Sequence, residues 1–144
     1  MGLRFSSAGS TDVGRAREAN EDAFQVCEKQ NLWILADGMG GHVAGAVASQ
    51  ICVEAIADFM TRWCREGDFE WPFEIMDSRS FDENALLNSV RVANVRIYNR
   101  AQVDEDCDGM GTTCVVMCYS EQAGMVIAHV GDSRTYRLRE QEMV

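Results

Sequence analysis

Residues 32–42 read LWILADGMGGH, an apolar run that ends in an aspartate and a cluster of glycines. The branched and aromatic side chains predict a strand over residues 31–36. Asp37 stands at its end, and the glycines that follow let the backbone turn sharply. A carboxylate in this position, together with the Gly38 carbonyl, can face one cation. A plain strand-to-helix turn explains the same residues, so this motif alone does not decide between the two.

The hydrophobic pattern on either side of this stretch predicts strands, then two helices, then strands again. Apolar residues recur every three or four positions from residue 41 to about 65, which indicates a long helix. Ser80 and Glu83 form a capping box that begins a second helix. Residues 29–31 predict a hairpin turn. Strands are expected at residues 3–9, 23–28, 31–36, 112–119, 124–130 and 135–138. This order favours an α+β protein with helices on one face of an antiparallel sheet.

Composition narrows the class of protein. The chain has 144 residues, the size of one domain, and 23 acidic against 13 basic residues give a net charge of -10. This balance argues against nucleic-acid binding and against an anionic membrane surface. The sequence contains neither a run of 18 apolar residues nor a signal peptide at its start, so we expect a cytoplasmic protein without membrane insertion. The six cysteines lack zinc-binding spacing and are expected to be reduced, mostly buried thiols.

Two further motifs place charged residues beside predicted strands. Residues 17–22 read REANED, in which Arg17 is either part of a surface ion-pair cluster or, if the carboxylates hold metals, a clamp for a phosphate. Residues 128–134 read AHVGDSR, a second apolar strand that ends in Gly-Asp. Two strands that deliver aspartates at their ends suggest that Asp37 and Asp132 converge on one rim of a sheet. Sequence spacing alone does not prove that convergence.

Residues 104–109, DEDCDG, match the first half of a calcium-binding EF-hand loop. Position 12 of such a loop would be Val115 instead of glutamate, and a strand is expected where a helix is required. An exposed acidic loop is therefore the better interpretation.

Four motifs in this order resemble the metal-dependent Ser/Thr protein phosphatases, the PPM or protein phosphatase 2C family, in its bacterial branch. The resemblance covers residues 12–139, nearly the whole chain. Its motifs are GRAREANED at residues 14–22, DGMGGHVAGAVAS at 37–49, MGTT at 110–113 and GDSRTYR at 131–137. It implies a four-layer αββα sandwich of antiparallel sheets flanked by helices, with two Mn²⁺ or Mg²⁺ ions and a weaker third in a cleft at the sheet edges.

The resemblance also implies a role for each matching residue. By similarity, Asp37 bridges the two metals and the Gly38 carbonyl binds the second. Asp22 belongs to the metal site and orients metal-bound water, Arg17 holds the substrate phosphate, and Asp132 helps to bind the third metal. The implied reaction is hydrolysis of phosphoserine or phosphothreonine in proteins by a metal-bridged hydroxide, without a covalent enzyme intermediate. Phosphorylated proteins would be the partners, among them the substrates of a bacterial Ser/Thr kinase and the kinase itself.

Two histidines stand near the motifs. In the eukaryotic branch a histidine follows the metal-binding Asp-Gly and is a candidate general acid, but Met39 occupies that position here. His42 is therefore not assigned that role and is expected to start the helix or support the site. His129, in an apolar strand, is expected to be a hydrogen-bonded core histidine.

The family's catalytic domain is considerably longer, and its later part supplies two more metal-binding aspartates. This chain contains no aspartate after Asp132. Residues 1–144 are therefore expected to be the N-terminal portion of a single catalytic domain, inactive alone and prone to self-associate. The alternative is a non-catalytic, phosphatase-like module that binds a partner through the same cleft. Intact Arg17, Asp22, Asp37 and Asp132 favour the enzyme.

Overall fold

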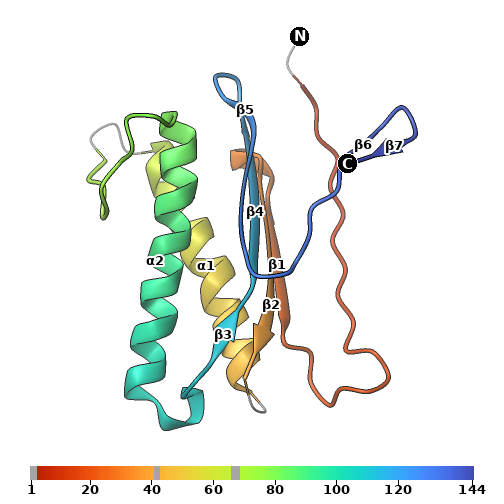
Figure 1. Cartoon of the computed structure of the whole chain (residues 1–144), viewed down its shortest axis with the longest axis vertical. Coiled ribbons are helices and arrows are strands. Elements are labelled where there is room, and N and C mark those ends of the chain that lie inside the picture. Colours follow the sequence, from red (N-terminus) through yellow and green to blue (C-terminus); the bar gives the residue numbers. More distant parts are fainter. Residues whose placement is uncertain (1–2, 41–42, 66–68) are drawn as a thin grey trace.

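The computed structural model describes residues 3–40, 43–65 and 69–144. An antiparallel sheet with the strand order β1-β2-β4-β5 carries two helices on one face, and the short β3 pairs with the end of β2 (Figure 1). A two-stranded ribbon, β6-β7, follows β5. The elements are β1 (Asp22–Cys27), η1 (Glu28–Gln30), β2 (Leu32–Met39), α1 (Ala44–Arg65), α2 (Phe81–Val103), η2 (Glu105–Cys107), β3 (Gly111–Thr112), β4 (Cys114–Ser120), β5 (Gly124–Val130), β6 (Leu138–Arg139) and β7 (Glu142–Met143).

The β1-β2 hairpin confirms the turn predicted at residues 29–31. A single 3-10 turn, η1, connects the strands, and Asn31 takes the left-handed conformation with φ 46° before β2 begins. Asparagine tolerates this conformation better than most residues. The turn fixes the register, in which Asp22 pairs with Asp37 and Cys27 with Leu32. The two aspartates therefore lie side by side at the open end of the hairpin.

Helix α1 buries the predicted stripe of small residues against the sheet. Ala44, Ala48, Cys52 and Ala55 are almost fully buried, and Phe59 lies among them at 5% exposure. Small side chains let the helix axis approach β1 and β2 closely, and the same helix packs along α2. The predicted start at residues 41–42 lies outside the described residues. Neither of the helices in the described ranges is long and apolar enough to cross a membrane.

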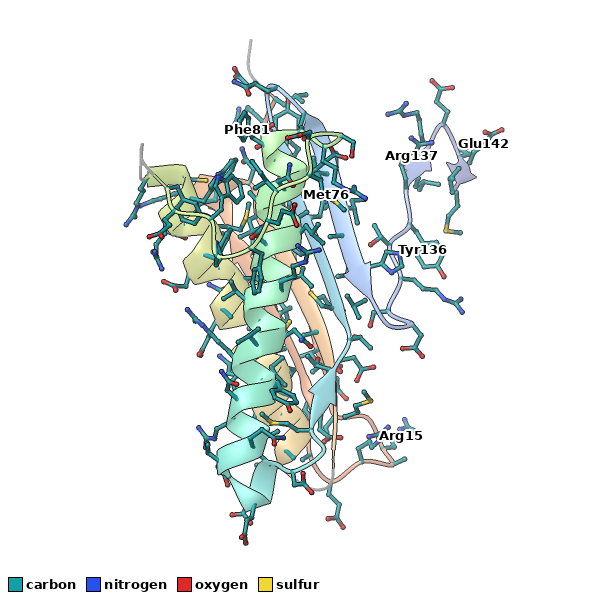
Figure 2. All side chains as sticks on the ribbon, turned by 60° about the vertical axis from the view of Figure 1, so that its left-hand side comes forward. Arg15, Met76, Phe81, Tyr136, Arg137 and Glu142 are labelled. Carbon is teal, nitrogen blue, oxygen red and sulfur yellow. The ribbon has the colours of Figure 1, made fainter. Side chains whose placement is uncertain are left out.

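Helix α2 begins at the predicted capping box. The Glu83 amide donates to Ser80 Oγ at 3.2 Å, and the Ser80 amide donates to Glu83 Oε2 at 2.8 Å. Buried Asn84 and Asn88 then anchor the irregular segment before the helix. Asn84 Oδ1 accepts from the Met76 amide at 2.8 Å and Asn88 Oδ1 from the Phe73 amide at 3.1 Å. These bonds hold the segment around Met76 beside α2 (Figure 2).

The strand predicted at residues 3–9 is wrong. This segment crosses the sheet face away from the helices without strand pairing (Figure 1). The Phe5 ring packs on Trp33 and Tyr119, with centroid separations of 5.3 and 5.0 Å, and Trp33 Nε1 donates to Ser7 Oγ at 2.6 Å. The apolar pattern is real, but it serves packing on a sheet face instead of pairing at a sheet edge.

The strand predicted at residues 135–138 is also wrong, except for Leu138. Residues 133–137 form no regular element, and Leu138 opens the β6-β7 ribbon. Glu140 and Gln141 make its turn with φ 50° and 72°, both in the left-handed region. A two-residue hairpin turn of type I′ needs that conformation at both central positions. Figure 2 shows this ribbon, with Arg137 and Glu142, standing away from the main sheet.

The acidic segment is not an EF-hand, as predicted. Asp104 caps η2 by accepting from the Asp106 amide, and its carboxylate also accepts from the Arg100 guanidinium at 2.7 Å. Strand β3 follows where an EF-hand needs a helix. The expectation for the thiols is confirmed as well, because all six are free and four are buried.

The prediction that His129 lies in the core is wrong. His129 is exposed on β5, whereas its neighbours Val126 and Ala128 pack against the core beneath the helices. Alternation along the strand places His129 on the opposite face of an edge strand. No helix of the described residues covers that face, so an apolar sequence context does not bury this histidine (Figure 1).

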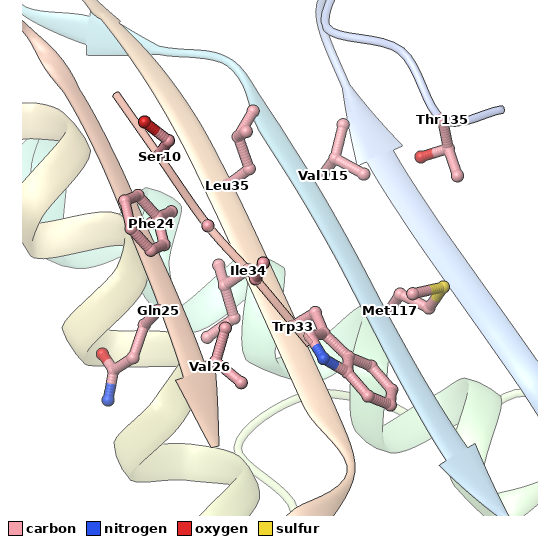
Figure 3. Close-up of a pocket in the computed structure, with 12 residues that line it drawn as sticks. Ser10, Phe24, Gln25, Val26, Trp33, Ile34, Leu35, Val115, Met117 and Thr135 are labelled. Atoms are coloured by element: carbon pink, nitrogen blue, oxygen red, sulfur yellow. The ribbon is translucent and has the colours of Figure 1, made fainter. Parts of the chain in front are cut away.

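The α+β class is confirmed, and the described residues form one helical layer on one main antiparallel sheet of the predicted four-layer sandwich. The other sheet face is apolar and partly open. Phe24 and Leu35 remain 39% and 45% exposed there. A pocket of about 190 Å³ lies on this face. Figure 3 shows it between the sheet and the segment at Ser10.

Candidate active site

Three aspartates gather at one rim of the sheet. Asp22 and Asp37 are register partners, and Asp132 follows the end of β5. All three are exposed to solvent. Partial desolvation is the largest effect that raises the pKa of Asp37, and the charges of Asp22 and Asp132 raise it further, while Arg17 opposes them. The structure therefore brings Arg17, Asp22 and Asp132 within electrostatic reach of Asp37.

Thr113 joins the strand end that carries Asp37 to the turn that carries Asp132. The Asp37 amide donates to Thr113 Oγ1 at 3.0 Å, and the Thr113 amide donates to the Asp37 carbonyl at 2.9 Å. The same hydroxyl lies 2.7 Å from Ser133 Oγ. Gly131 packs on the Thr113 side chain with φ 93°, a conformation that favours glycine. Thr113 and Ser133 thereby explain how two distant motifs meet.

Asp22 is held by a short polar network. Its amide donates to Asn20 Oδ1 at 3.0 Å, and its carboxylate accepts from Thr11 Oγ1 at 3.2 Å. Asn20 Nδ2 in turn donates to Thr11 Oγ1 at 2.8 Å. The network fixes the Asp22 carboxylate beside Asp37 and gives Asn20 of the REANED motif a structural role. Thr11 lies outside every motif quoted above, so its part was not predicted.

Arg17 is the cation that lowers the pKa of Asp37 against the effect of the neighbouring carboxylates. Its side chain is 74% exposed, and Nη1 lies 3.2 Å from Glu21 Oε2. The Glu21 carbonyl also accepts from the Gly38 amide at 3.0 Å, so the segment of Arg17 is tied to the end of β2. An exposed guanidinium beside this rim can bind an anion such as a phosphate.

Gly38 allows the end of β2 to touch the first turn of α1. A Cβ atom there would collide with the carbonyl oxygens of Gly45 and Glu21. Only glycine therefore fits, which explains the glycine after Asp37. His42, also in this motif, lies outside the described residues.

The donor atoms at the rim are carboxylate oxygens, which hard cations such as Mg²⁺ and Mn²⁺ prefer. Desolvation raises the pKa of Asp37 most, and the charges of Asp22 and Asp132 raise it further; a bound cation would relieve this repulsion between the carboxylates. The residues present thus fit such a metal. Within residues 3–40, 43–65 and 69–144, however, no three His, Cys, Asp or Glu side chains are close enough to hold an ion by themselves.

Fold and site together define an α+β protein whose sheet rim presents acidic oxygens and an arginine, a combination suited to divalent cations and phosphoryl groups. The sequence matches the family described as protein phosphatase 2C over residues 13–144. The chain therefore belongs to the protein phosphatase 2C family, as the motifs predicted.

Known relatives agree with this assignment. The chain is 39% identical over 136 residues to the serine/threonine phosphatase stp of Listeria innocua, covering 92% of this chain and 50% of that protein. The crystal structure of the Mycobacterium tuberculosis serine/threonine phosphatase PstP/Ppp matches with a TM-score of 0.71 and 34% identity, over 91% of this chain and 48% of that one. The catalytic domain of PstP in complex with two manganese ions matches with a TM-score of 0.69 and 33% identity, over 90% and 49%. The chain thus spans about half the length of these relatives.

Proposed function

We propose that the complete natural protein is a metal-dependent phosphatase that hydrolyses phosphoserine and phosphothreonine in proteins. The observation that carries this proposal is the placement of Asp22, Asp132 and Arg17 within electrostatic reach of Asp37 in a chain of this family. The names of its relatives support the same activity.

Asp37 and the Gly38 carbonyl are the proposed ligands of a pair of Mn²⁺ or Mg²⁺ ions. Asp132 is proposed to help bind a third ion, which is held more weakly. The manganese in the related PstP structure supports Mn²⁺ as the first metal to test. When bound, such cations lower the pKa of water and offset the negative charge on phosphoryl oxygens. Thr113 holds the backbone of Asp37 in place for this role.

Asp22 and Arg17 act on water and substrate in this proposal. The network of Asn20 and Thr11 directs the Asp22 carboxylate toward Asp37, where it can orient the attacking water by accepting a hydrogen bond from it. Arg17, exposed beside the rim, holds the substrate phosphate in line. Arg17 lies on the segment that leads into β1, and Asp22 is the first residue of that strand, so one stretch of chain positions both water and phosphate.

The proposed substrates are proteins phosphorylated by a bacterial Ser/Thr kinase, and the kinase itself. We also propose that residues 1–144 form the N-terminal portion of one catalytic domain in a cytoplasmic protein. The family match over residues 13–144 and the coverage of about half of each relative support the proposal that residues 1–144 are one portion of a catalytic domain. The alternative, a partner-binding module without activity, is not favoured because the four charged site residues are all present.

The test is phosphopeptide hydrolysis by the complete natural protein with metal removed and restored. A chelator should abolish release of inorganic phosphate, and added Mn²⁺ should restore it. Full activity after removal of all divalent metal would contradict the proposal, and so would no activity at any concentration of Mn²⁺ or Mg²⁺.

A further inference from the structure

Met39, the last residue of β2, presents a large apolar side chain at the rim of the sheet. It remains 63% exposed. Alternation along the strand puts Met39 on the same face as the exposed Asp37, whereas Ala36 and Gly38 are buried on the other face. A thioether has no proton to donate and is a poor ligand for hard cations. The site described above therefore gives Met39 no chemical role.

Gly111 provides the surface on which the Met39 side chain rests. The two residues are register partners in the β2-β3 pair. A Cβ atom on Gly111 would lie 2.9 Å from Met39 Cε and 3.6 Å from Cγ, so the methionine occupies the space that a side chain at position 111 would need. The thioether is thus supported by the backbone of β3 on one side and open to solvent on the other.

The position of Met39 relative to Asp37 distinguishes it from an ordinary exposed methionine. The two residues lie about 7 Å apart along one strand. The Thr113 amide, which donates to the Asp37 carbonyl at 2.9 Å, holds this end of β2 in place. In a phosphopeptide, the Cα atoms beside the phosphorylated residue are about 3.8 Å from its own Cα. A peptide whose phosphate lies at the rim therefore brings a flanking side chain within reach of Met39.

The chemistry of the thioether selects the kind of flanking side chain. A flexible methionine adapts to apolar side chains of different shapes and buries them favourably. A charged or amide side chain resting on the same atoms would lose hydration without gaining a hydrogen bond. Leucine, isoleucine or methionine beside the phosphorylated residue therefore fits this surface best.

We propose that Met39, resting on Gly111, is a specificity-determining residue that contacts an apolar side chain next to the phosphorylated serine or threonine of the substrate. This inference rests on the proposed phosphatase function and narrows its substrate class. The contact is made to a part of the peptide that does not react. It acts in the ground state and the transition state alike, so it should appear mainly in KM.

Hydrolysis of matched phosphoserine peptides by the complete natural protein with Mn²⁺ tests the proposal. The peptides differ only in carrying Leu or Gly immediately before or after the phosphoserine. Wild type should favour Leu at one of these two positions by about fivefold in kcat/KM, through a lower KM. Met39→Gln, which keeps the length of the side chain and makes it polar, should bring this ratio close to one.

The matched control is Met76→Gln, the same change at a half-exposed methionine beside α2 (Figure 2). It should keep the wild-type ratio. The proposal is overturned if wild type shows no preference between Leu and Gly, or if the preference survives in Met39→Gln or is lost equally in Met76→Gln. In each of these cases metal-dependent hydrolysis still supports the phosphatase function. A wild-type protein without such hydrolysis overturns the function and this inference with it.

A second variant tests the role of Gly111. The backbone of Gly111 is not left-handed, so Gly111→Ala should displace only the flexible end of Met39. It should lower the preference for Leu by at least about twofold in wild type and leave the ratio unchanged in a Met39→Gln background, because the displaced group is absent there. An equal effect in both backgrounds contradicts the proposed support of Met39 by Gly111.

A measurement without turnover shows the contact directly. The probe is the Leu-containing peptide with a phosphonate in place of the phosphate ester, which is not hydrolysed, bound to protein with ¹³C-labelled methionine methyl groups and Mg²⁺. The methyl resonance of Met39, assigned by its loss in Met39→Gln, should show nuclear Overhauser contacts to the leucine methyl groups. A saturated complex in which Met39 lacks these contacts overturns the proposal.

Discussion

Arg17 is exposed over 74% of its side chain and is paired with Glu21. Such an ion pair contributes about 0 to 1 kcal/mol to stability, so Arg17→Ala should leave the melting temperature nearly unchanged. Its KM for a phosphorylated substrate should rise, because a phosphate clamp acts in both the ground state and the transition state. Steady-state kinetics and thermal unfolding of the wild-type and Arg17→Ala proteins test these two expectations. Unaltered KM and kcat would remove Arg17 from the site.

The sequence predicted the carboxylates of the rim better than the residues that join them. Aspartates at the ends of apolar strands are conspicuous, and antiparallel register places Asp22 beside Asp37. Thr113 and Ser133 are short polar residues of a common kind. The bond between Thr113 and Asp37 spans 76 positions, so only the assembled sheet reveals it. His129 was misplaced because burial of an edge strand depends on what covers each face.

At the scale of elements, the capping box of α2 gives a prediction about acid stability. The backbone hydrogen bond from Ser80 is the main cause that lowers the pKa of Glu83. A carboxyl whose folded pKa is lowered stabilises the protein above its unfolded pKa, about 4.3, and this contribution disappears as the pH falls through the folded pKa. Melting curves of wild type and Glu83→Gln should therefore differ most near neutral pH and converge in acid. A gap that widens as the pH falls would contradict this assignment.

The elements with strong local signals were predicted well. The repeat of small residues in α1, the capping box of α2 and the turn before β2 depend on neighbours in the chain, and the structure contains all three. Residues 3–9 were misjudged because an apolar extended segment looks the same whether it pairs with a strand or packs on a sheet face. The choice between these depends on residues such as Trp33 and Tyr119, far away in the sequence.

At the scale of the whole molecule, two features lead to one prediction: the uncovered apolar face of the sheet and the small number of metal-binding oxygens at its rim. Residues 1–144 expressed alone should be catalytically silent, bind Mn²⁺ weakly and self-associate. The described residues contain no complete metal-holding cluster, and Phe24 and Leu35 remain exposed on the apolar face. Calorimetric titration with Mn²⁺ and light scattering test the two halves. Tight two-site binding with turnover by a monomer would contradict both.

The central claim is that Asp37 lies at the centre of a metal-dependent phosphatase site. Its side chain is exposed, and its backbone bonds to Thr113 do not involve the carboxylate, so Asp37→Asn should fold normally. Removing this charge weakens attraction for divalent cations. The deciding measurement is the rate of Mn²⁺-dependent phosphopeptide hydrolysis by wild-type and Asp37→Asn forms of the complete natural protein. The expected result is a fall of at least about a hundredfold at an unchanged melting temperature, since each ~1.4 kcal/mol lost is a factor of ten. Near-normal turnover by folded Asp37→Asn would contradict the account.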